Sequence, residues 1–213
     1  MVEAVKEKAR ERGEVPTSRD VLKRVKEKRQ AQQREEQAAD IEKMPAPLGE
    51  HDVIVIDPPW PYEKRTGDVT HRGRCPYPSM SIAEIAALEL PAAENSIVWL
   101  WTTNAFTHEA YHVLEAWGCE PKTILTWIKD RMGLGDWLRG KTEHCIMAVK
   151  GKPLVRLTNQ TTALHAPMRE HSRKPDEFYQ LVAELCPGSK CELFSREKRE
   201  GWVNYGAERD VFE

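Results

Sequence analysis

The sequence has no long apolar run and none of the cysteine spacings that accompany disulfides or structural zinc. No hydrophobic stretch approaches the roughly 20 residues that span a membrane, and the charged N-terminus lacks the apolar core of a signal peptide. The five cysteines, at positions 75, 119, 145, 186 and 191, are odd in number and form no C-x-x-C pair. We therefore expect a soluble cytoplasmic protein with reduced thiols and without a cysteine-based metal site.

The chain also lacks an overall excess of positive charge. Its 213 residues carry a net charge of −2. Residues 1–37, with 11 Lys and Arg against 8 Asp and Glu, have a net charge of +3. The remaining residues therefore carry −5. Any contact with nucleic acid must come from local patches rather than from the protein as a whole.

Residues 1–37 have few aliphatic side chains and no aromatic one. Such a segment cannot bury a face of its own, so it predicts a solvated helix. An arm that contacts phosphates or a partner subunit fits this pattern as well as a charged lead-in without a role does. We predict a charged helical arm over residues 1–37 and one domain over residues 38–213, a length that allows a sizeable core.

The stretch V-I-V-I-D-P-P-W at residues 53–60 predicts a buried strand that ends at Asp57, because two prolines follow. Ligands of open α/β sheets bind outside the carboxyl ends of such strands. A strand over 96–102, a helix over 104–117 and a strand over 123–129 predict a βαβ unit with a parallel strand pair. The fold class expected is α/β.

The residues after the first strand suit one kind of chemistry. The exocyclic amine of adenine is a poor nucleophile, because its lone pair is delocalised into the ring. Asp57 and the Pro58 carbonyl can each accept one of its N–H groups and orient the nitrogen toward a methyl donor. Pro59 shapes the turn, and Trp60 offers a flat face to an extruded base. The alternative is an ordinary proline turn with Trp60 in the core.

The D-P-P-W sequence after an apolar strand resembles motif IV of the amino-methyltransferases that use S-adenosylmethionine. Residues 40–208 as a whole resemble the family named for the seventy-kilodalton AdoMet-binding subunit of mRNA N6-adenosine methyltransferase, in its phage and bacterial branch. The resemblance implies a Rossmann-like fold with permuted motif order, since D-P-P-W comes first and the E-L-F of residues 192–194 comes last. The acid at the first motif position implies adenine N6 as the acceptor.

The resemblance also implies a set of cofactor-binding residues. Asp40 and its neighbour Ile41, ahead of D-P-P-W, match the pair that receives the cofactor's adenine in the family. Lys174, at a helix start, can pair with the cofactor carboxylate or with a phosphate. Glu192 is expected to accept both ribose hydroxyls. Ala207 replaces a family asparagine, for which Asn204 is a candidate substitute. The set is Asp40, Ile41, Asp57, Lys174, Glu192, Leu193, Phe194, Arg196 and Glu208.

On the substrate side, the resemblance places Tyr77 in a segment that closes the acceptor pocket and Glu143 in an E-H-C strand motif that faces the acceptor. A strand-start acid without a role is the alternative for Glu143. Cations in the loop after Trp60 favour contact with backbone phosphates, with solvent-exposed loop charge as the alternative. These cations are Lys64, Arg65, Arg72 and Arg74.

Two helix starts carry local signals. Ser81 and Glu84 have the spacing of a capping box ahead of a helix over 82–88. Pro175 suits the first position of a helix that ends at Cys186, and acids follow it in the first turn. Further strands are expected over 143–151 and 190–196.

Residues 108–112 read H-E-A-Y-H, a literal H-E-x-x-H, which on a helix places two imidazoles on one face. A zinc protease needs a third ligand further along the chain, and residues 128–136 contain no glutamate. A surface pair on a crossover helix is the stronger interpretation.

The sequence therefore predicts an enzyme that moves the methyl group of S-adenosylmethionine to adenine N6 in a polynucleotide, with DNA favoured over RNA. RNA methylation, a non-catalytic methyltransferase-like subunit and a zinc protease remain as alternatives. A homodimer or a partner subunit, held through the arm or the edge loops, is left open.

Overall fold

A computed structural model describes residues 49–62, 79–133, 137–156, 159–170 and 173–206, together with Val25 and Lys28, which are both helical. The predicted boundary between the arm and the domain falls outside these residues and stays a prediction. None of the described helices is long and apolar enough to cross a membrane.

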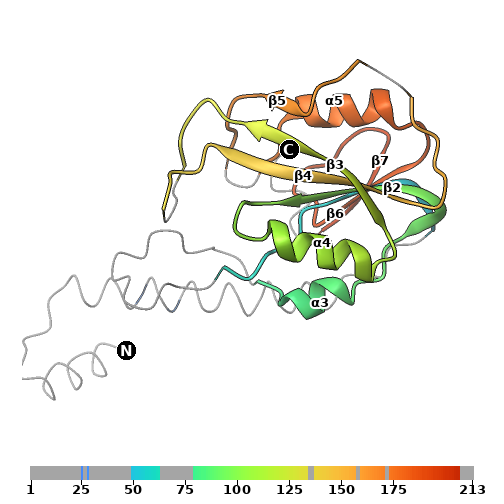
Figure 1. The fold of residues 1–213 in the computed structure, drawn as a ribbon, viewed down its shortest axis with the longest axis horizontal. Coiled ribbons are helices and arrows are strands. Elements are labelled where there is room, and N and C mark those ends of the chain that lie inside the picture. The colour runs from blue at the N-terminus through green and yellow to red at the C-terminus, as the bar shows by residue number, and fades with distance from the viewer. Residues whose placement is uncertain are drawn as a thin grey trace, which may run out of the picture. The chain divides into compact units, whose positions relative to one another are not determined.

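Seven strands form one mixed sheet in the order β5-β3-β4-β2-β1-β6-β7 (Figure 1). Of these described strands, β4 alone runs antiparallel to its neighbours. The carboxyl ends of the other six strands and the amino end of β4 therefore lie at one edge, which we call the carboxyl edge. The strands are β1 (His51–Ile56), β2 (Ala92–Thr102), β3 (Glu120–Ile128), β4 (Thr142–Lys150), β5 (Ala163–His165), β6 (Lys190–Leu193) and β7 (Trp202–Tyr205).

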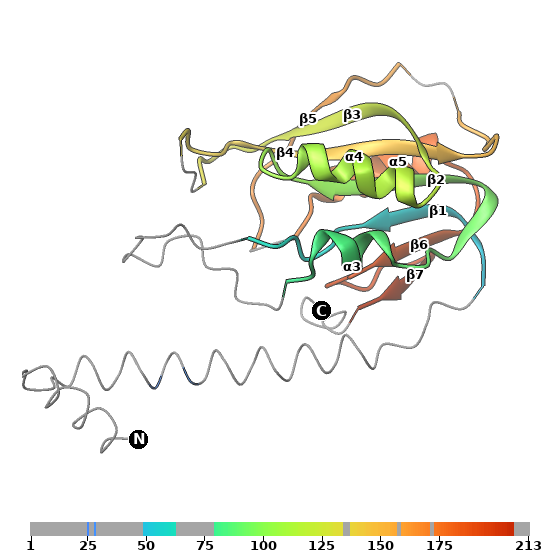
Figure 2. The ribbon, with the colours of Figure 1, turned by 60° about the horizontal axis from the view of Figure 1, so that its bottom comes forward.

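Helices cover both faces of the sheet. The helices α3 (Ile82–Ala86) and α4 (Thr107–Ala116) lie on one face, and α5 (Asp176–Leu185) lies on the other (Figures 1 and 2). The alternation of β1 follows from this arrangement. Val53 and Val55 belong to the apolar cluster that includes residues of α5, whereas Ile54 and Ile56 belong to the cluster that includes residues of α3 and α4.

Several predicted elements are confirmed. The strand over 53–56 is β1, and the capping box is present in full. The Glu84 amide donates to Ser81 Oγ at 3.2 Å, and the Ser81 amide donates to Glu84 Oε2 at 2.7 Å. The strand expected at Glu143 is β4, and the helix expected after Pro175 is α5, with Pro175 as its N-cap rather than its first residue.

The predicted parallel pair of strands is wrong as a pair. The strands β2 and β3 do run in the same direction, but β4 lies between them and is antiparallel to both. After β3 the chain turns back, and β4 pairs antiparallel with β3. It thereby occupies the position that a direct β2–β3 pair would have needed.

Candidate active site

The turn after β1 is built from two consecutive three-residue turns, each centred on a proline. The Trp60 amide donates to the Pro58 carbonyl at 2.9 Å, and the Tyr62 amide donates to the Trp60 carbonyl at 2.9 Å. Pro59 and Pro61 occupy the central positions, where the fixed φ of proline is close to that of an inverse γ-turn. The Pro58 carbonyl keeps a second lone pair for another donor.

Asp57 lies at the carboxyl edge on the α5 side, because it follows Val53 and Val55 in the alternation of β1. The Lys174 ammonium donates to Asp57 Oδ2 at 2.6 Å. Within the described part of the chain, Asp57 Oδ1 accepts no hydrogen bond, and 29% of the side chain is exposed. Asp57 therefore retains an accessible acceptor oxygen.

The pair of Asp57 and Lys174 belongs to a chain of four alternating charges. Lys174 Nζ also lies 3.2 Å from Glu143 Oε2, and Lys129 Nζ lies 2.5 Å from Glu143 Oε1. Glu143 pairs in register with Trp127, and Lys129 comes two residues after Trp127, so both share one face of the sheet. The reversed direction of β4 is what brings Glu143, at the start of its strand, to the same edge as Asp57.

Burial and the neighbouring charges shift the pKa values of this chain. Burial raises the pKa of Asp57 above its ordinary value, and the Lys174 ammonium opposes that shift without cancelling it. Burial also raises the pKa of Glu143, but Lys174 and Lys129 outweigh it, and the net shift is downward. For Lys174, burial lowers the pKa, yet its two carboxylate partners raise it overall.

Lys174 was expected to pair with a cofactor carboxylate or a phosphate. The structure instead commits its ammonium to Asp57 and Glu143, with the Trp101 ring centroid 5.1 Å away. Lys174 and Glu143 are thus brought to the predicted catalytic acid, although Lys174 serves as a partner of that acid.

Trp60 differs from its predicted role. Its side chain is 3% exposed, its ring stacks on Phe106 with centroids 5.5 Å apart, and its indole N–H donates to the Trp101 carbonyl at 3.0 Å. An open face for an extruded base is therefore absent here, because packing covers the indole. Tyr62 is the exposed aromatic of this turn, at 45%. Its ring meets the Phe106 ring edge-to-face at 4.9 Å, and its hydroxyl bonds to Thr103 Oγ1 at 3.1 Å.

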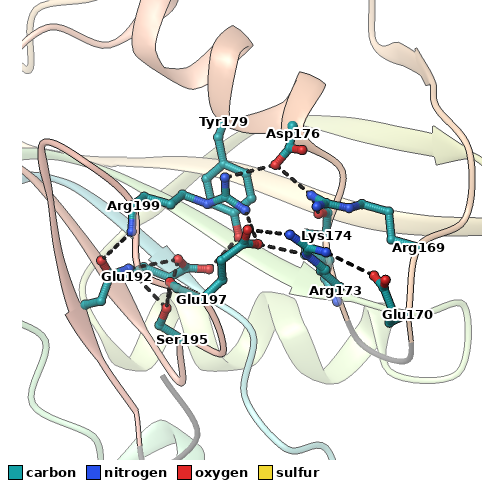
Figure 3. A network of polar contacts seen from close by, with 11 residues as sticks. Arg169, Glu170, Arg173, Lys174, Asp176, Tyr179, Glu192, Ser195, Glu197 and Arg199 are labelled. Atoms are coloured by element: carbon teal, nitrogen blue, oxygen red, sulfur yellow. Dashed lines mark hydrogen bonds and ion pairs between the residues drawn. The ribbon is translucent and has the colours of Figure 1, made fainter. Parts of the chain in front are cut away.

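Glu192 lies on β6, beside β1, and pairs in register with Val55. Its Oε1 accepts from the Tyr179 hydroxyl at 2.5 Å, and its Oε2 accepts from Asn204 Nδ2 at 3.2 Å (Figure 3). Ser195 Oγ lies 3.1 Å from Oε2 and 2.8 Å from the Glu197 carbonyl, so its one proton is shared between these two acceptors. Burial raises the pKa of Glu192 to about 7, against the lowering effect of the Tyr179 hydrogen bond.

These contacts bear on two predictions. The Ser195 hydroxyl has one proton and lies closer to the Glu197 carbonyl, at 2.8 Å, than to Glu192 Oε2, so both oxygens of Glu192 keep an acceptor position and its role toward the ribose hydroxyls stays a prediction. Asn204 uses both amide hydrogens, on Glu192 and on Ser195 Oγ, while its Oδ1 accepts the Arg199 amide at 3.1 Å. Asn204 is thus not available to replace the family asparagine missing at position 207.

The chain turns sharply where β6 ends. Phe194 has a φ of 58°. Among the described residues, it is the only one other than glycine with a positive φ. Leu193, just before it, pairs with Ile56 of β1 and Tyr205 of β7. The predicted strand over 190–196 therefore stops at Leu193. Backbone held in such a sparsely populated conformation is found preferentially at functional sites.

Three arginines clamp the segment before α5 to the loop after β6 (Figure 3). Arg173 bonds Glu197 through Nε at 2.9 Å and Nη2 at 2.5 Å, and Arg199 Nη2 reaches the same carboxylate at 2.8 Å. Arg199 and Arg169 both bond Asp176 Oδ1, at 3.0 and 2.6 Å. Because Lys174 lies inside this clamped segment, the network fixes the position from which its ammonium reaches Asp57.

The H-E-x-x-H pair lies on α4 with both imidazoles exposed. His108 Nε2 and His112 Nε2 are 3.2 Å apart. Across the residues the structure describes, no third His, Cys, Asp or Glu completes a metal-binding group with them. This arrangement fits the surface-pair interpretation.

Several predicted site residues lie outside the described residues, and their roles stay predictions. They are Asp40, Ile41, Lys64, Arg65, Arg72, Arg74, Tyr77 and Glu208. Arg196 is described, and its charge lowers the pKa of Asp57, which places it within electrostatic reach of that acid.

The sequence interpretation missed Lys129, Tyr62, Tyr179 and Ser195. A signal existed for Lys129, because a cation directly after an apolar strand is placed at the strand's end by the same argument that placed Asp57. Tyr179 and Ser195 had no such signal, since their role depends on the contact of α5 with β6, which are separate segments of the chain.

A mixed sheet with helices on both faces, with D-P-P-W at the carboxyl edge beside E-L-F on the next strand, defines a Rossmann-like α/β methyltransferase fold with permuted motif order. Residues 51–208 match the family model of MT-A70. The chain belongs to the MT-A70 family.

Individual relatives agree with this assignment. A "Probable N(6)-adenosine-methyltransferase MT-A70-like" protein of Oryza sativa subsp. japonica is 33% identical over 171 residues, which cover 75% of this chain and 23% of the relative. The "N(6)-adenosine-methyltransferase catalytic subunit METTL3" of Homo sapiens is 30% identical over 178 residues, covering 76% and 29%. The "Type II methyltransferase M.MunI" of Mycoplasma sp is 29% identical over 184 residues, covering 76% and 79%. The chain thus spans about a quarter of the plant relative.

Proposed function

We propose that this protein transfers the methyl group of S-adenosylmethionine to the N6 amine of adenine in a polynucleotide, with DNA favoured as the substrate. The observation that carries the proposal is the turn at Asp57. It keeps one carboxylate oxygen without a partner in the described structure and one lone pair on the next carbonyl, at the edge where α/β folds bind ligands.

The adenine amine has two N–H groups, and the turn has two acceptors for them. One N–H donates to Asp57 Oδ1 and the other to the Pro58 carbonyl. Both bonds strengthen as the nitrogen becomes positive, so they favour the transition state over the ground state. Lys174 opposes the rise that burial causes in the pKa of Asp57 and so favours the ionised carboxyl, which is the stronger acceptor.

Tyr62, rather than Trp60, is proposed to stack on the extruded base. Tyr62 is two residues after Trp60, is exposed, and lies close enough to the site for Asp57 and Glu143 to contribute to raising its pKa, after burial. The Phe106 ring, which is stacked on the buried Trp60, meets the Tyr62 ring edge-to-face. Stacking on an exposed ring next to an acceptor pair accounts for holding the base without reading its sequence context.

The residues at the carboxyl edge fit S-adenosylmethionine, which supplies a positively charged sulfonium methyl group when bound. Two carboxylates on adjacent strands, Asp57 and Glu192, share the α5 face and each retain an acceptor position. Asp57 supplies negative charge near a sulfonium, and Glu192 retains acceptor positions for ribose hydroxyls. Arg196 and the backbone at Phe194 complete this side. Asp40, Ile41 and Glu208 are proposed for the remaining contacts on family resemblance.

DNA is favoured over RNA because the match extends over 79% of the Mycoplasma Type II methyltransferase. The relatives named as N(6)-adenosine-methyltransferases keep RNA as the second candidate. A non-catalytic subunit is the less favoured alternative, since Asp57, Pro58, Pro59 and Trp60 are all present.

Transfer of a tritiated methyl group to single- and double-stranded DNA and RNA tests the proposal. We expect label in a DNA substrate, recovered as N6-methyladenine after nuclease digestion. Label in RNA alone would assign the second candidate. Thermal stabilisation by the cofactor or its demethylated product without any transfer would favour a non-catalytic subunit, and no stabilisation would remove the cofactor from the proposal.

A further inference from the structure

Lys129 ends the charge chain at the side away from Asp57. Its side chain is 14% exposed, its ammonium lies 2.5 Å from Glu143 Oε1, and the ring centroid of Trp127 is 4.6 Å from it. The Lys129 amide also donates to the Lys141 carbonyl at 2.9 Å, which closes the end of the β3–β4 ladder. Both the backbone and the ammonium of Lys129 are therefore held in place.

Lys174 divides its ammonium between two carboxylates, Asp57 Oδ2 at 2.6 Å and Glu143 Oε2 at 3.2 Å. The division depends on how much negative charge Glu143 presents. Lys129 pairs with the other oxygen of Glu143, and the shorter contact of Lys174 goes to Asp57.

We propose that Lys129 is a positioning residue that, through Glu143, holds the Lys174 ammonium against Asp57 and so keeps Asp57 in its ionised, acceptor form. The inference deepens the proposed function, on which its catalytic meaning rests. Lys129 does not touch the reacting atoms. It acts on Asp57 electrostatically, through Glu143 and Lys174.

Two physical effects point the same way. Without Lys129, the uncompensated Glu143 draws the Lys174 ammonium toward itself, and Asp57 loses part of its ion pair. The site also loses one positive charge, which by itself disfavours an ionised carboxyl. The other charged or titratable groups around Asp57 stay in place. They are Tyr62, Cys145, Glu192 and Arg196.

The test compares Lys129→Met with Lys122→Met. Lys122 lies on β3, the strand that Lys129 directly follows. It is 42% exposed and pairs with Glu120, so its replacement makes the same chemical change away from the site. The readouts are the acid limb of the pH profile for methyl transfer and the titration of the Asp57 carboxyl carbon by NMR, assigned by its absence in Asp57→Asn.

We expect Lys129→Met to move both the acid limb and the Asp57 titration to higher pH by about half a unit or more. Lys122→Met should shift neither the acid limb nor the Asp57 titration. Lys129→Arg keeps the positive charge, so Asp57 should titrate in it as in the wild type. An unchanged Asp57 titration in Lys129→Met would overturn the inference. If that variant does not fold, Lys129→Gln takes its place with the same expected direction.

The route through Glu143 is tested by adding Lys129→Met to Glu143→Gln. Because Lys129 acts through Glu143, the second change should then shift the Asp57 titration much less than it does alone. A full shift in the Glu143→Gln background would contradict the route. The titration needs no turnover, so a protein that transfers no methyl group would refute the proposed function while the NMR result still decides the role of Lys129.

Discussion

The two acids at the carboxyl edge differ in how their oxygens are used. Asp57 has one charged partner, Lys174, and an oxygen without a partner among the described residues. Glu192, one strand away on the same face, accepts from Tyr179 and Asn204 and shares the Ser195 hydroxyl with the Glu197 carbonyl. The first acid is held in place and left open to a further donor, whereas the second is bound by several of the fold's own donors.

This difference separates two uses of a buried carboxylate. An acid that accepts from the fold's own donors ties elements together, as Glu192 ties α5 to β6 and β7. An acid that uses one oxygen in an ion pair, as Asp57 uses Oδ2, presents the other oxygen to a ligand. On the proposed function, the half of the edge at β1 is the catalytic one, and the β6 half chiefly ties elements together.

Asp57→Ala should break the catalytic half. We expect methyl transfer to fall by about 1000-fold or more, because the amine loses its charged acceptor. Binding of the cofactor's demethylated product should weaken less. Initial rates of tritiated methyl transfer and calorimetry measure the two quantities.

Glu192→Gln removes the negative charge of the second acid and keeps the shape of its side chain. It should lower methyl transfer far less than Asp57→Ala does. Transfer in the wild type should also fall on acidification, at a higher pH than an ordinary Asp carboxyl would give, because burial raises the pKa of Asp57 and the ionised form is the better acceptor. Near-normal turnover in Asp57→Ala would refute its assigned role.

Lys174→Met should destabilise the fold by about 1–3 kcal/mol, because it leaves two partly buried carboxylates without their shared cation. Urea unfolding monitored by tryptophan fluorescence gives the change in the free energy of unfolding. Lys152→Met, at an exposed lysine, is the control and should change that free energy little. Equal, small effects of both changes would show that the charge chain is not a structural unit.

Tyr62→Ala should weaken binding of the polynucleotide by about 1–3 kcal/mol, the usual contribution of one stacked base. Tyr62→Phe keeps the ring and loses only the bond to Thr103, so it should bind nearly as the wild type does. Fluorescence anisotropy with a labelled oligonucleotide measures both. If Tyr62→Ala binds as tightly as Tyr62→Phe, the base is held elsewhere.

Glu192 should give the stability of the protein a distinct pH dependence. Its folded-state pKa is about 7 against an ordinary 4.5, so between these values the folded protein retains a proton that the unfolded chain has lost. The free energy of unfolding therefore falls as pH rises through this window, by at most about 1.4 kcal/mol per pH unit.

Glu192→Gln removes the titrating group and should flatten the slope. Urea unfolding at several pH values between about 4.5 and 7 measures it. An equal slope in the variant and the wild type would show that Glu192 does not titrate in this range.

Elements with strong local signals were predictable from the sequence. The apolar run of β1 and its stop at Asp57, the capping box of α3 and the start of α5 all follow from neighbouring residues. The strands β5 and β7 were not predicted, since three and four residues are too few to show an alternating pattern. The place of β4 between β2 and β3 is a property of the whole sheet, which no local pattern records.

The candidate site was predictable to the same extent. Asp57 and Glu143 stand at strand ends, so alternation and family resemblance together indicated that they lie at the carboxyl edge. The contact of Lys174 with Asp57 was not predicted, because it depends on the packing of α5 on the sheet. The burial of Trp60 depends likewise on Phe106, more than 40 residues away in the sequence. Contacts of this kind arise only once the faces of the sheet are covered.

A structure of the protein with an adenine-containing oligonucleotide and the cofactor's demethylated product tests the central claim most directly. The account predicts the adenine amine nitrogen within about 3 Å of both Asp57 Oδ1 and the Pro58 carbonyl oxygen, with Lys174 still on Oδ2. An adenine bound with its amine away from the turn, or Asp57 with both oxygens on protein donors, would contradict it.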